Sequence, residues 1–274
     1  MKRQEPLNLV SYLAPNMFWF YQAFAAYLER FLNIKINIFE SQYEPLTDPA
    51  LLQNKLDIAF ICGLPFIQYN RHFSEQIQAL VAPVMQAKRY QNRPVYFSDI
   101  IVNAKSNYQA FADLANQTFS YNDRGSNSGY NLVRYRLLQA GYSNHFFKQT
   151  IAAGSHQNSI KLVAEGIADC AAIDSIVLEQ ELQDFPEYSQ HLRIIESLGP
   201  FPIPPIIVSQ KLGSVFINSL QSALLHPDTE LQLAMAKAGI KCYVPVKSED
   251  YLMLGNIYDI TLKAGYEIIG NNHK

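Results

Sequence analysis

The fold is decided by residues 167–173, IADCAAI, together with a similar run at 55–61, KLDIAFI. Both runs are largely apolar around one aspartate, which is typical of a buried strand. Aligning the two runs places Asp57 on Asp169, and an alanine follows two positions later in both. The match indicates that two parts of the chain share one architecture.

The residues around each run strengthen this interpretation, because both parts show the order strand, helix, strand, helix, strand. In the first part, the patterns predict strands at 7–12, 35–41 and 56–63 and helices at 18–32 and 45–55. In the second part, they predict strands at 118–122, 148–154 and 168–173 and helices at 126–141 and 157–165. This order is the unit of a parallel sheet, so the sequence predicts an α/β protein.

Two extended segments, 95–102 and 203–208, are candidates for the connections between two lobes. A chain that crosses at the first and returns at the second has a discontinuous first lobe, 1–98 with 204–274, and a second lobe, 99–203. Two connecting strands form a hinge, and the ligand cleft is then expected between the lobes.

Composition excludes several classes of function. The chain has 274 residues, of which 49% are apolar, enough to fill two cores. Its 22 Lys and Arg against 24 Asp and Glu leave no basic excess for nucleic acid, and no apolar run is long enough to span a membrane. Neither the three cysteines nor the histidines show metal-binding spacing, so we expect no metal and no cofactor.

The N-terminal residues bear on the compartment. Residues 1–6 are charged and short, and no apolar segment with a cleavage site precedes the first predicted strand. We therefore expect a cytoplasmic protein if Met1 is the native start, and a periplasmic or other extracytoplasmic one if a signal segment has been removed.

The candidate ligand site lies beyond the carboxyl ends of the predicted strands, where open α/β sheets bind ligands. Ser126, Asn127 and Ser128 begin a predicted helix there. A helix start offers backbone N–H groups and the positive end of the helix dipole, and hydroxyls add donors, so the segment can bind an oxyanion. The same residues are equally typical of a helix cap that binds nothing.

Two further polar residues lie at predicted strand ends, and each also has a structural interpretation. His156 follows one strand, and Asp174 ends another. A carboxylate buried there must be paired or hydrogen-bonded. Beside an anion it is repulsive unless the ligand carries a proton or an amine to donate.

Three segments of the second part carry a family resemblance: YNDRGSNSGY at 121–130, AGSHQNSI at 153–160 and VAEGIADCAAIDS at 163–175. QYEPL at 42–46, LDIA at 56–59 and YFSDIIV at 96–102 extend it to most of the chain. The chain thereby resembles the phosphonate-, phosphite- and phosphate-binding proteins of ABC importers. The resemblance implies a two-lobed type II periplasmic-binding-protein fold, each lobe a mixed sheet flanked by helices, that closes on a small oxyanion.

Carried over by position, the resemblance implies seven ligand-binding residues: Tyr43, Tyr96, Ser126, Asn127, Ser128, His156 and Asp174. The three at the helix start would hold the oxygens of the anion, the histidine and tyrosines would donate further hydrogen bonds, and the aspartate would meet a proton or amine of the ligand. The membrane permease of an importer is the implied partner, and we expect a monomer. The family has threonine where this chain has Asn127, which leaves the choice among phosphate, phosphite and phosphonate open.

Two other functions stay open on the residues. One is a cytoplasmic anion sensor of the same fold, and the other is a hydrolase that uses Ser126 or Ser128, His156 and Asp174. The hydrolase is disfavoured because GSNSG puts Asn127 at the nucleophile position of the G-x-S-x-G motif. The chain order Ser, His, Asp also differs from that of the hydrolase fold. We therefore expect a binding protein and not an enzyme.

Overall fold

The computed structural model describes residues 5–270, and the chain divides into two compact units. The first unit takes the residues up to Val95 together with Pro202–Leu252. The second takes Tyr96–Phe201 together with the residues from Met253 onwards. Within residues 5–270, none of the helices combines the length and the apolar character needed to cross a membrane.

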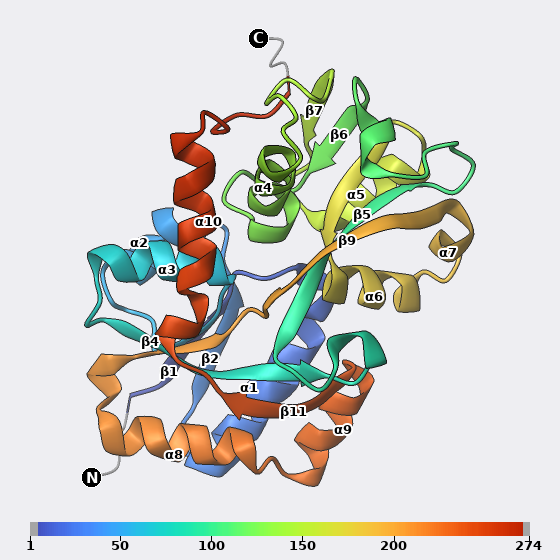
Figure 1. Ribbon diagram of the computed structural model, residues 1–274. Coiled ribbons are helices and arrows are strands. Elements are labelled where there is room, and N and C mark those ends of the chain that lie inside the picture. The colour runs from blue at the N-terminus through green and yellow to red at the C-terminus, as the bar shows by residue number, and fades with distance from the viewer. Residues whose placement is uncertain (1–4, 271–274) are drawn as a thin grey trace. The chain divides into compact units, whose positions relative to one another are not determined.

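The first unit is built on a mixed sheet with helices packed on it. Its strands are β1 (Leu7–Ser11), β2 (Ile36–Glu40), β3 (Ile58–Phe60), β4 (Ile77–Met85), β10 (Ile206–Ser209) and β11 (Ile240–Pro245). Its helices are α1 (Phe18–Leu32), α2 (Pro49–Leu52), α3 (Gly63–His72), α8 (Ser214–Leu225) and α9 (Thr229–Lys237). The strands lie in the order β11-β4-β10-β3-β1-β2. Figure 1 labels four of them, β1, β2, β4 and β11. Strand β1 is parallel to both β2 and β3, whereas β10 is antiparallel to β3.

The second unit repeats this plan with a smaller sheet. Its strands are β5 (Val95–Asn103), β6 (Thr118–Tyr121), β7 (Gln149–Ala152), β8 (Cys170–Asp174) and β9 (Leu192–Pro202). Its helices are α4 (Leu132–Gln139), α5 (His156–Ala164), α6 (Ser175–Asp184), α7 (Tyr188–His191) and α10 (Leu252–Lys263), whose first residue the division assigns to the first unit. The strand order is β7-β6-β8-β5-β9. Strand β6 is parallel to both β7 and β8, whereas β5 is antiparallel to β8.

The two matched aspartates confirm the repeat at the level of hydrogen bonds. Asp57 Oδ2 accepts from the backbone N–H of Asn8 at 2.8 Å, and Asp169 Oδ2 accepts from that of Thr118 at 2.8 Å. In return, the backbone N–H of each aspartate donates to the carbonyl of the same partner residue, at 2.9 Å in both units. Each aspartate therefore fastens the first strand of its unit to the third.

Most predicted elements are confirmed, and the exceptions have local causes. The helix predicted at 45–55 is shorter, because Asp48 starts a new helix by accepting from the backbone N–H of Ala50 at 2.7 Å, and only α2 follows it. The second connection was predicted at 203–208, but the unit boundary falls before Pro202, at the end of β9. Strand β10 belongs instead to the sheet of the first unit.

The predicted lobe boundaries also need correction. The prediction placed residues 204–274 in the first lobe, but residues 253–270 belong to the second unit. Ile257 and Ile269 lie in the hydrophobic core of that unit, and the backbone N–H of Ile269 donates to Tyr130 Oη at 3.1 Å. The first boundary lies at Val95 rather than at residue 98. Residues 1–4, which bear on a signal segment, and residues 271–274 lie outside the described residues.

Candidate functional site

The helix predicted at 126–141 begins with a turn of π-helix, Asn127–Asn131, and continues as α4. Ser126 caps it, because its Oγ accepts from the backbone N–H of Gly129 at 3.0 Å. A backbone bond closes the turn from Asn131 N to Ser126 O at 3.0 Å, one residue later than in an α-helix. The wider turn leaves an additional N–H without an α-helical partner at the helix start, and such π-turns are frequent at functional sites.

The loop after β6 closes directly on this helix start. A Cβ at Gly129 would overlap Asn122 Oδ1 and would come within 3.1 Å of Ser126 Oγ. A side chain at position 129 would therefore force the side chain of Asn122 to move.

Five of the seven predicted residues are joined by sequence adjacency or by hydrogen bonds of their side chains. Asn127 Nδ2 donates to Tyr96 Oη at 2.7 Å, and Ser128 Oγ lies 3.2 Å from His156 Nε2. Ser126 completes the group through its position in the cap. All five side chains are buried. The structure thus gathers hydroxyl, amide and imidazole donors around one helix start.

One hydrogen bond joins His156 and Ser128, which carry two polar protons between them. Burial lowers the pKa of His156 to about 4, so the imidazole is neutral near pH 7 and carries one proton. The hydroxyl of Ser128 carries another, and the contact between Oγ and Nε2 uses one of the two. His156 Nδ1 is buried and has no hydrogen-bond partner within residues 5–270. The pair can therefore offer one donor to a ligand.

Asp174 caps helix α6, because its Oδ1 accepts from the backbone N–H of Ile176 at 2.9 Å. Its burial raises its pKa to about 7, although backbone hydrogen bonds oppose that change. Asp174 pairs in register with Ser98 on β5, and Ser98 Oγ donates to the carbonyl of Ser128 at 2.8 Å. Residues opposite each other on neighbouring strands share a face, so Ser98 connects the strand position beside Asp174 to the first turn of the helix.

The seventh predicted residue, Tyr43, belongs to the first unit and lies in the loop after β2. Its side chain is 58% exposed, and its backbone N–H donates to Ser41 Oγ at 3.1 Å. In the same unit, Ser41 and Tyr12 both donate to Asp48 Oδ2 at 2.8 Å. A contribution of Tyr43 to ligand binding stays a prediction.

Sequence reasoning missed three buried residues behind the helix start: Ser98, Asn131 and Arg134. Asn131 follows Asn127 by four positions, and Arg134 follows Asn131 by three. Asn127, Asn131 and Arg134 therefore share one helix face. That spacing was the available signal. Among residues 5–270, no group of three or more His, Cys, Asp or Glu could hold a metal ion.

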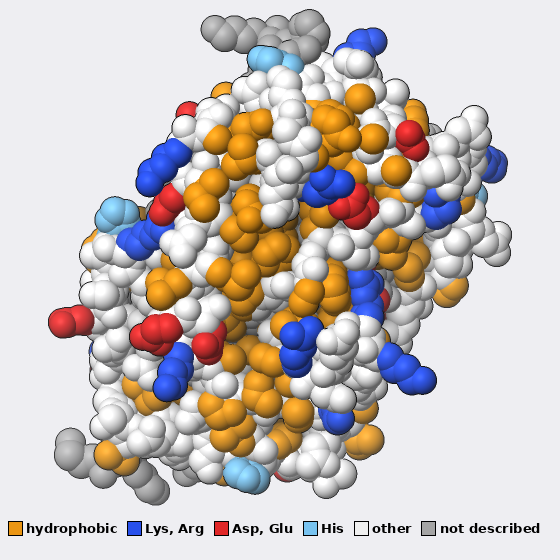
Figure 2. Space-filling model, viewed as in Figure 1, with side chains coloured by type: hydrophobic (Ala, Val, Ile, Leu, Met, Phe, Trp, Pro, Cys, Tyr) orange, Lys and Arg blue, Asp and Glu red, His pale blue; other side chains and the backbone are white. Residues whose placement is uncertain are grey.

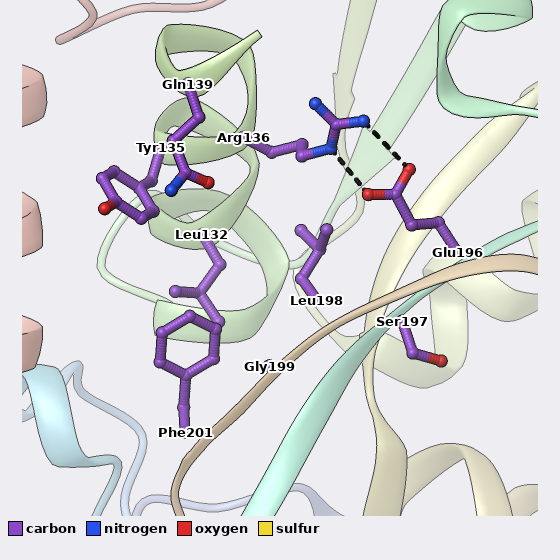
Figure 3. A pocket seen from close by; sticks show the side chains of 9 residues that line it. All are labelled: Leu132, Tyr135, Arg136, Gln139, Glu196, Ser197, Leu198, Gly199 and Phe201. Atoms are coloured by element: carbon purple, nitrogen blue, oxygen red, sulfur yellow. Dashed lines mark hydrogen bonds and ion pairs between the residues drawn. The ribbon is translucent and has the colours of Figure 1, made fainter.

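A separate cavity of about 370 Å³ lies in the second unit between α4 and β9 (Figure 3). None of the seven predicted residues lines it. Its charged residues, Arg136 and Glu196, satisfy each other through two contacts of 2.6 and 3.3 Å. Figure 2 shows hydrophobic side chains around a few charged ones on this face. The cavity therefore offers apolar walls rather than an available charge.

Solved structures share the fold at low sequence identity. A binding component of a Pseudomonas aeruginosa ABC phosphonate transporter has a TM-score of 0.82 at 17% identity, over 96% of this chain and 88% of that one. Prochlorococcus marinus PhnD1 in complex with methylphosphonate has a TM-score of 0.80 at 20% identity, over 95% of this chain and 98% of that one. The aliphatic sulphonate-binding protein SsuA of Escherichia coli has a TM-score of 0.66 at 16% identity, over 96% of this chain and 88% of that one. These likenesses establish a type II periplasmic-binding-protein fold.

Sequence comparison identifies the family. The chain is 26% identical over 179 residues to the probable phosphite-binding protein PhnD1 of Prochlorococcus marinus strain MIT 9301, a match that spans 63% of this chain and 60% of that protein. Residues 10–251 match the family model described as the periplasmic substrate-binding protein of ABC phosphonate transporters. The chain therefore belongs to the family of periplasmic phosphonate-binding proteins of ABC transporters.

Proposed function

We propose that the chain binds a small tetrahedral oxyanion, a phosphonate, phosphite or phosphate, and delivers it to the permease of an ABC importer. The observation that carries this proposal is the buried cluster of neutral donors around the π-turn at Asn127–Asn131. The family and the phosphite-binding relative support the choice of ligand class. Fold alone would not, because SsuA shares it and binds aliphatic sulphonates.

The binding chemistry relies on hydrogen bonds rather than on ion pairs with lysine or arginine. The ligand oxygens accept from backbone N–H groups of the first turn and from Ser126, Asn127 and Ser128, with the positive end of the helix dipole behind them. Tyr96 and the pair formed by His156 and Ser128 add donors. We expect Tyr43 of the first unit to contribute a further hydroxyl to the ligand.

The test is calorimetric titration with methylphosphonate, phosphite, phosphate, sulfate and an alkanesulfonate. Ser126→Ala and Ser128→Ala should each weaken binding of the preferred anion by about tenfold or more, the effect of losing a hydrogen bond to a charged group. Ser214→Ala is the matched control, because Ser214 also begins a helix but is exposed and lies in the first unit. Absence of binding to every anion, or equal affinities in the two site variants and the wild type, refutes the proposal.

Asp174 gives the site a preference that depends on pH. An ionised carboxylate near the anion repels sulfate, whereas a ligand that carries a proton can donate to it. Because burial raises the pKa of Asp174 to about 7, discrimination against sulfate should grow between pH 6 and pH 8. Asp174→Asn should abolish this pH dependence. A constant preference in the wild type would assign Asp174 to helix capping alone.

The alternative of a hydrolase rests on the 3.2 Å contact between Ser128 and His156. A triad needs an acid on the second ring nitrogen, but His156 Nδ1 has no hydrogen-bond partner within residues 5–270. We therefore propose that the protein is not an enzyme. Steady release of nitrophenol from p-nitrophenyl acetate by the wild type, lost in Ser128→Ala, would overturn this.

Two further expectations concern the protein in the cell. We propose that it acts as a monomer in the periplasm, because its family is periplasmic and delivers ligands to a membrane permease. Light scattering after size exclusion measures the mass, and cell fractionation measures the compartment. Recovery in the cytoplasm together with anion binding would favour a sensor.

A further inference from the structure

Arg134 is a buried cation held by neutral groups. Its side chain is 2% exposed, and the guanidinium carbon lies 5.5 Å from the ring centre of Tyr130 and 5.0 Å from that of Tyr258. Its nitrogens donate to Asn131 Oδ1 at 2.8 Å and to the carbonyl of Glu267 at 3.5 Å. Nε has no hydrogen-bond partner within residues 5–270. A buried charge without a paired carboxylate is costly, which calls for a functional reason.

Three hydrogen bonds connect this cation to the candidate site. Arg134 donates to Asn131, Asn131 Nδ2 donates to Asn127 Oδ1 at 3.0 Å, and Asn127 Nδ2 donates to Tyr96 Oη at 2.7 Å. Asn127, Asn131 and Arg134 share one face of the helix that begins at the π-turn. The side chains therefore form a continuous chain from the back of the helix to its start.

The chemistry of arginine fixes the direction of every bond in this chain. A guanidinium only donates, so Asn131 must present its oxygen to Arg134 and its nitrogen to Asn127. Asn127 must then accept through its oxygen and donate through its nitrogen to Tyr96. The hydroxyl oxygen of Tyr96 accepts that bond, and its proton points away from Asn127.

We propose that Arg134 is a positioning residue of the oxyanion site, which through Asn131 and Asn127 turns the hydroxyl proton of Tyr96 towards the ligand. This inference rests on the proposed function and adds to it how the donors are oriented. It also explains why an asparagine suits position 127. An amide accepts with one atom and donates with another, so it passes on a direction that a threonine hydroxyl can reverse by rotating.

The test reverses the direction of the hydrogen bond between Asn127 and Tyr96 without removing Arg134. In Asn131→Asp, the introduced carboxylate accepts from Arg134 and also from Asn127, so the amide of Asn127 turns over and presents its oxygen to Tyr96. The tyrosine proton then goes to Asn127 and is lost to the ligand. Methylphosphonate affinity should fall about tenfold or more.

A double-mutant cycle separates this effect from a general disturbance of the site. Tyr96→Phe should weaken methylphosphonate binding in the wild-type background but cause almost no further loss in the Asn131→Asp background. Independent, multiplying losses, or wild-type affinity in Asn131→Asp, overturn the inference while leaving the proposed function intact. A wild type that binds neither methylphosphonate, phosphite nor phosphate overturns both.

Substitutions of the arginine provide the second arm. Arg134→Lys keeps a pure donor and should retain more affinity than Arg134→Met, with melting temperature recorded for both variants. Arg136→Met is the matched control, because it removes a positive charge two residues further along α4 and breaks contacts with Glu196 and the Phe111 ring, neither of which belongs to the chain of hydrogen bonds from Arg134 to Tyr96. Equal affinities in the two Arg134 variants, or an equal loss in the control, would reduce the role of Arg134 to packing or to general charge.

Discussion

Replacing Asp174 by asparagine should stabilise the protein at alkaline pH and not at acid pH. Burial raises the pKa of this carboxyl from 3.8 to about 7 in the folded state. The folded state then binds the proton more tightly than the unfolded state. The contribution of the carboxyl to the free energy of unfolding is therefore greatest below about pH 4 and is lost as pH rises towards 7.

The size of the effect follows from the two pKa values. Their difference of about three pH units corresponds to about 4 kcal/mol at 1.36 kcal/mol per unit, which is an order-of-magnitude figure. Asparagine is as good a helix cap as aspartate and carries no charge, so Asp174→Asn keeps the cap on α6 and removes the cost of ionisation. We expect it to raise the free energy of unfolding by a few kcal/mol at pH 8.

The assay is urea unfolding of both proteins without ligand at pH 4 and pH 8. Asp113→Asn is the control with the opposite sign, because Asp113 accepts from the backbone N–H groups of Gln109 and Ala110 and its pKa is lowered. That variant should lose stability at pH 8 relative to pH 4. The reasoning fails if Asp174→Asn shows the same difference from wild type at both pH values.

Three more outcomes are expected. Burial lowers the pKa of His156 from 6.5 to about 4, so the neutral imidazole's contribution to the free energy of unfolding is lost as pH falls through that range. His156→Gln should therefore lose about 3 kcal/mol less stability than the wild type between pH 7 and pH 4 in urea unfolding. An equal loss in the two proteins would contradict this. Gly129→Ala forces the added methyl against Asn122 and should cost about 1–3 kcal/mol of stability and weaken methylphosphonate binding; calorimetry showing neither effect would argue against the close packing. Ile269→Ala should cost about 2–5 kcal/mol in thermal unfolding, because the side chain is fully buried, and a change near zero would mean that the C-terminal segment is not part of that core.

The limits of sequence reasoning follow from the range of the interactions involved. Helix α1 was predicted with its observed bounds because its apolar spacing is a local property of fifteen consecutive residues. The matched pair of Asp57 and Asp169 was visible because the repeat preserves spacing. Residues 253–270 were assigned to the wrong lobe, because the core that an amphipathic helix joins is decided by contacts distant in sequence.

In the candidate site, too, local signals were readable from the sequence and contacts between distant residues were not. Ser126, Asn127 and Ser128 were predicted from cap residues at a strand end, which are local signals. Arg134 was missed because an arginine in a helix is ordinarily exposed, and only the rings of Tyr130 and Tyr258 make its burial possible. One of those rings comes from α10, more than a hundred residues further along the chain.

The interleaving of the two units sets the order in which the protein can fold during synthesis. The sheet of the first unit waits for β10 and β11, and the core of the second waits for Ile257 and Ile269. A ribosome adds about 5–20 residues per second, so much of the chain emerges before either unit has all its parts. The first unit lacks part of its sheet until β11 has been made, and the second lacks part of its core until the segment from α10 to Ile269 has been made. The late segments thus place the completion of both units near the end of synthesis.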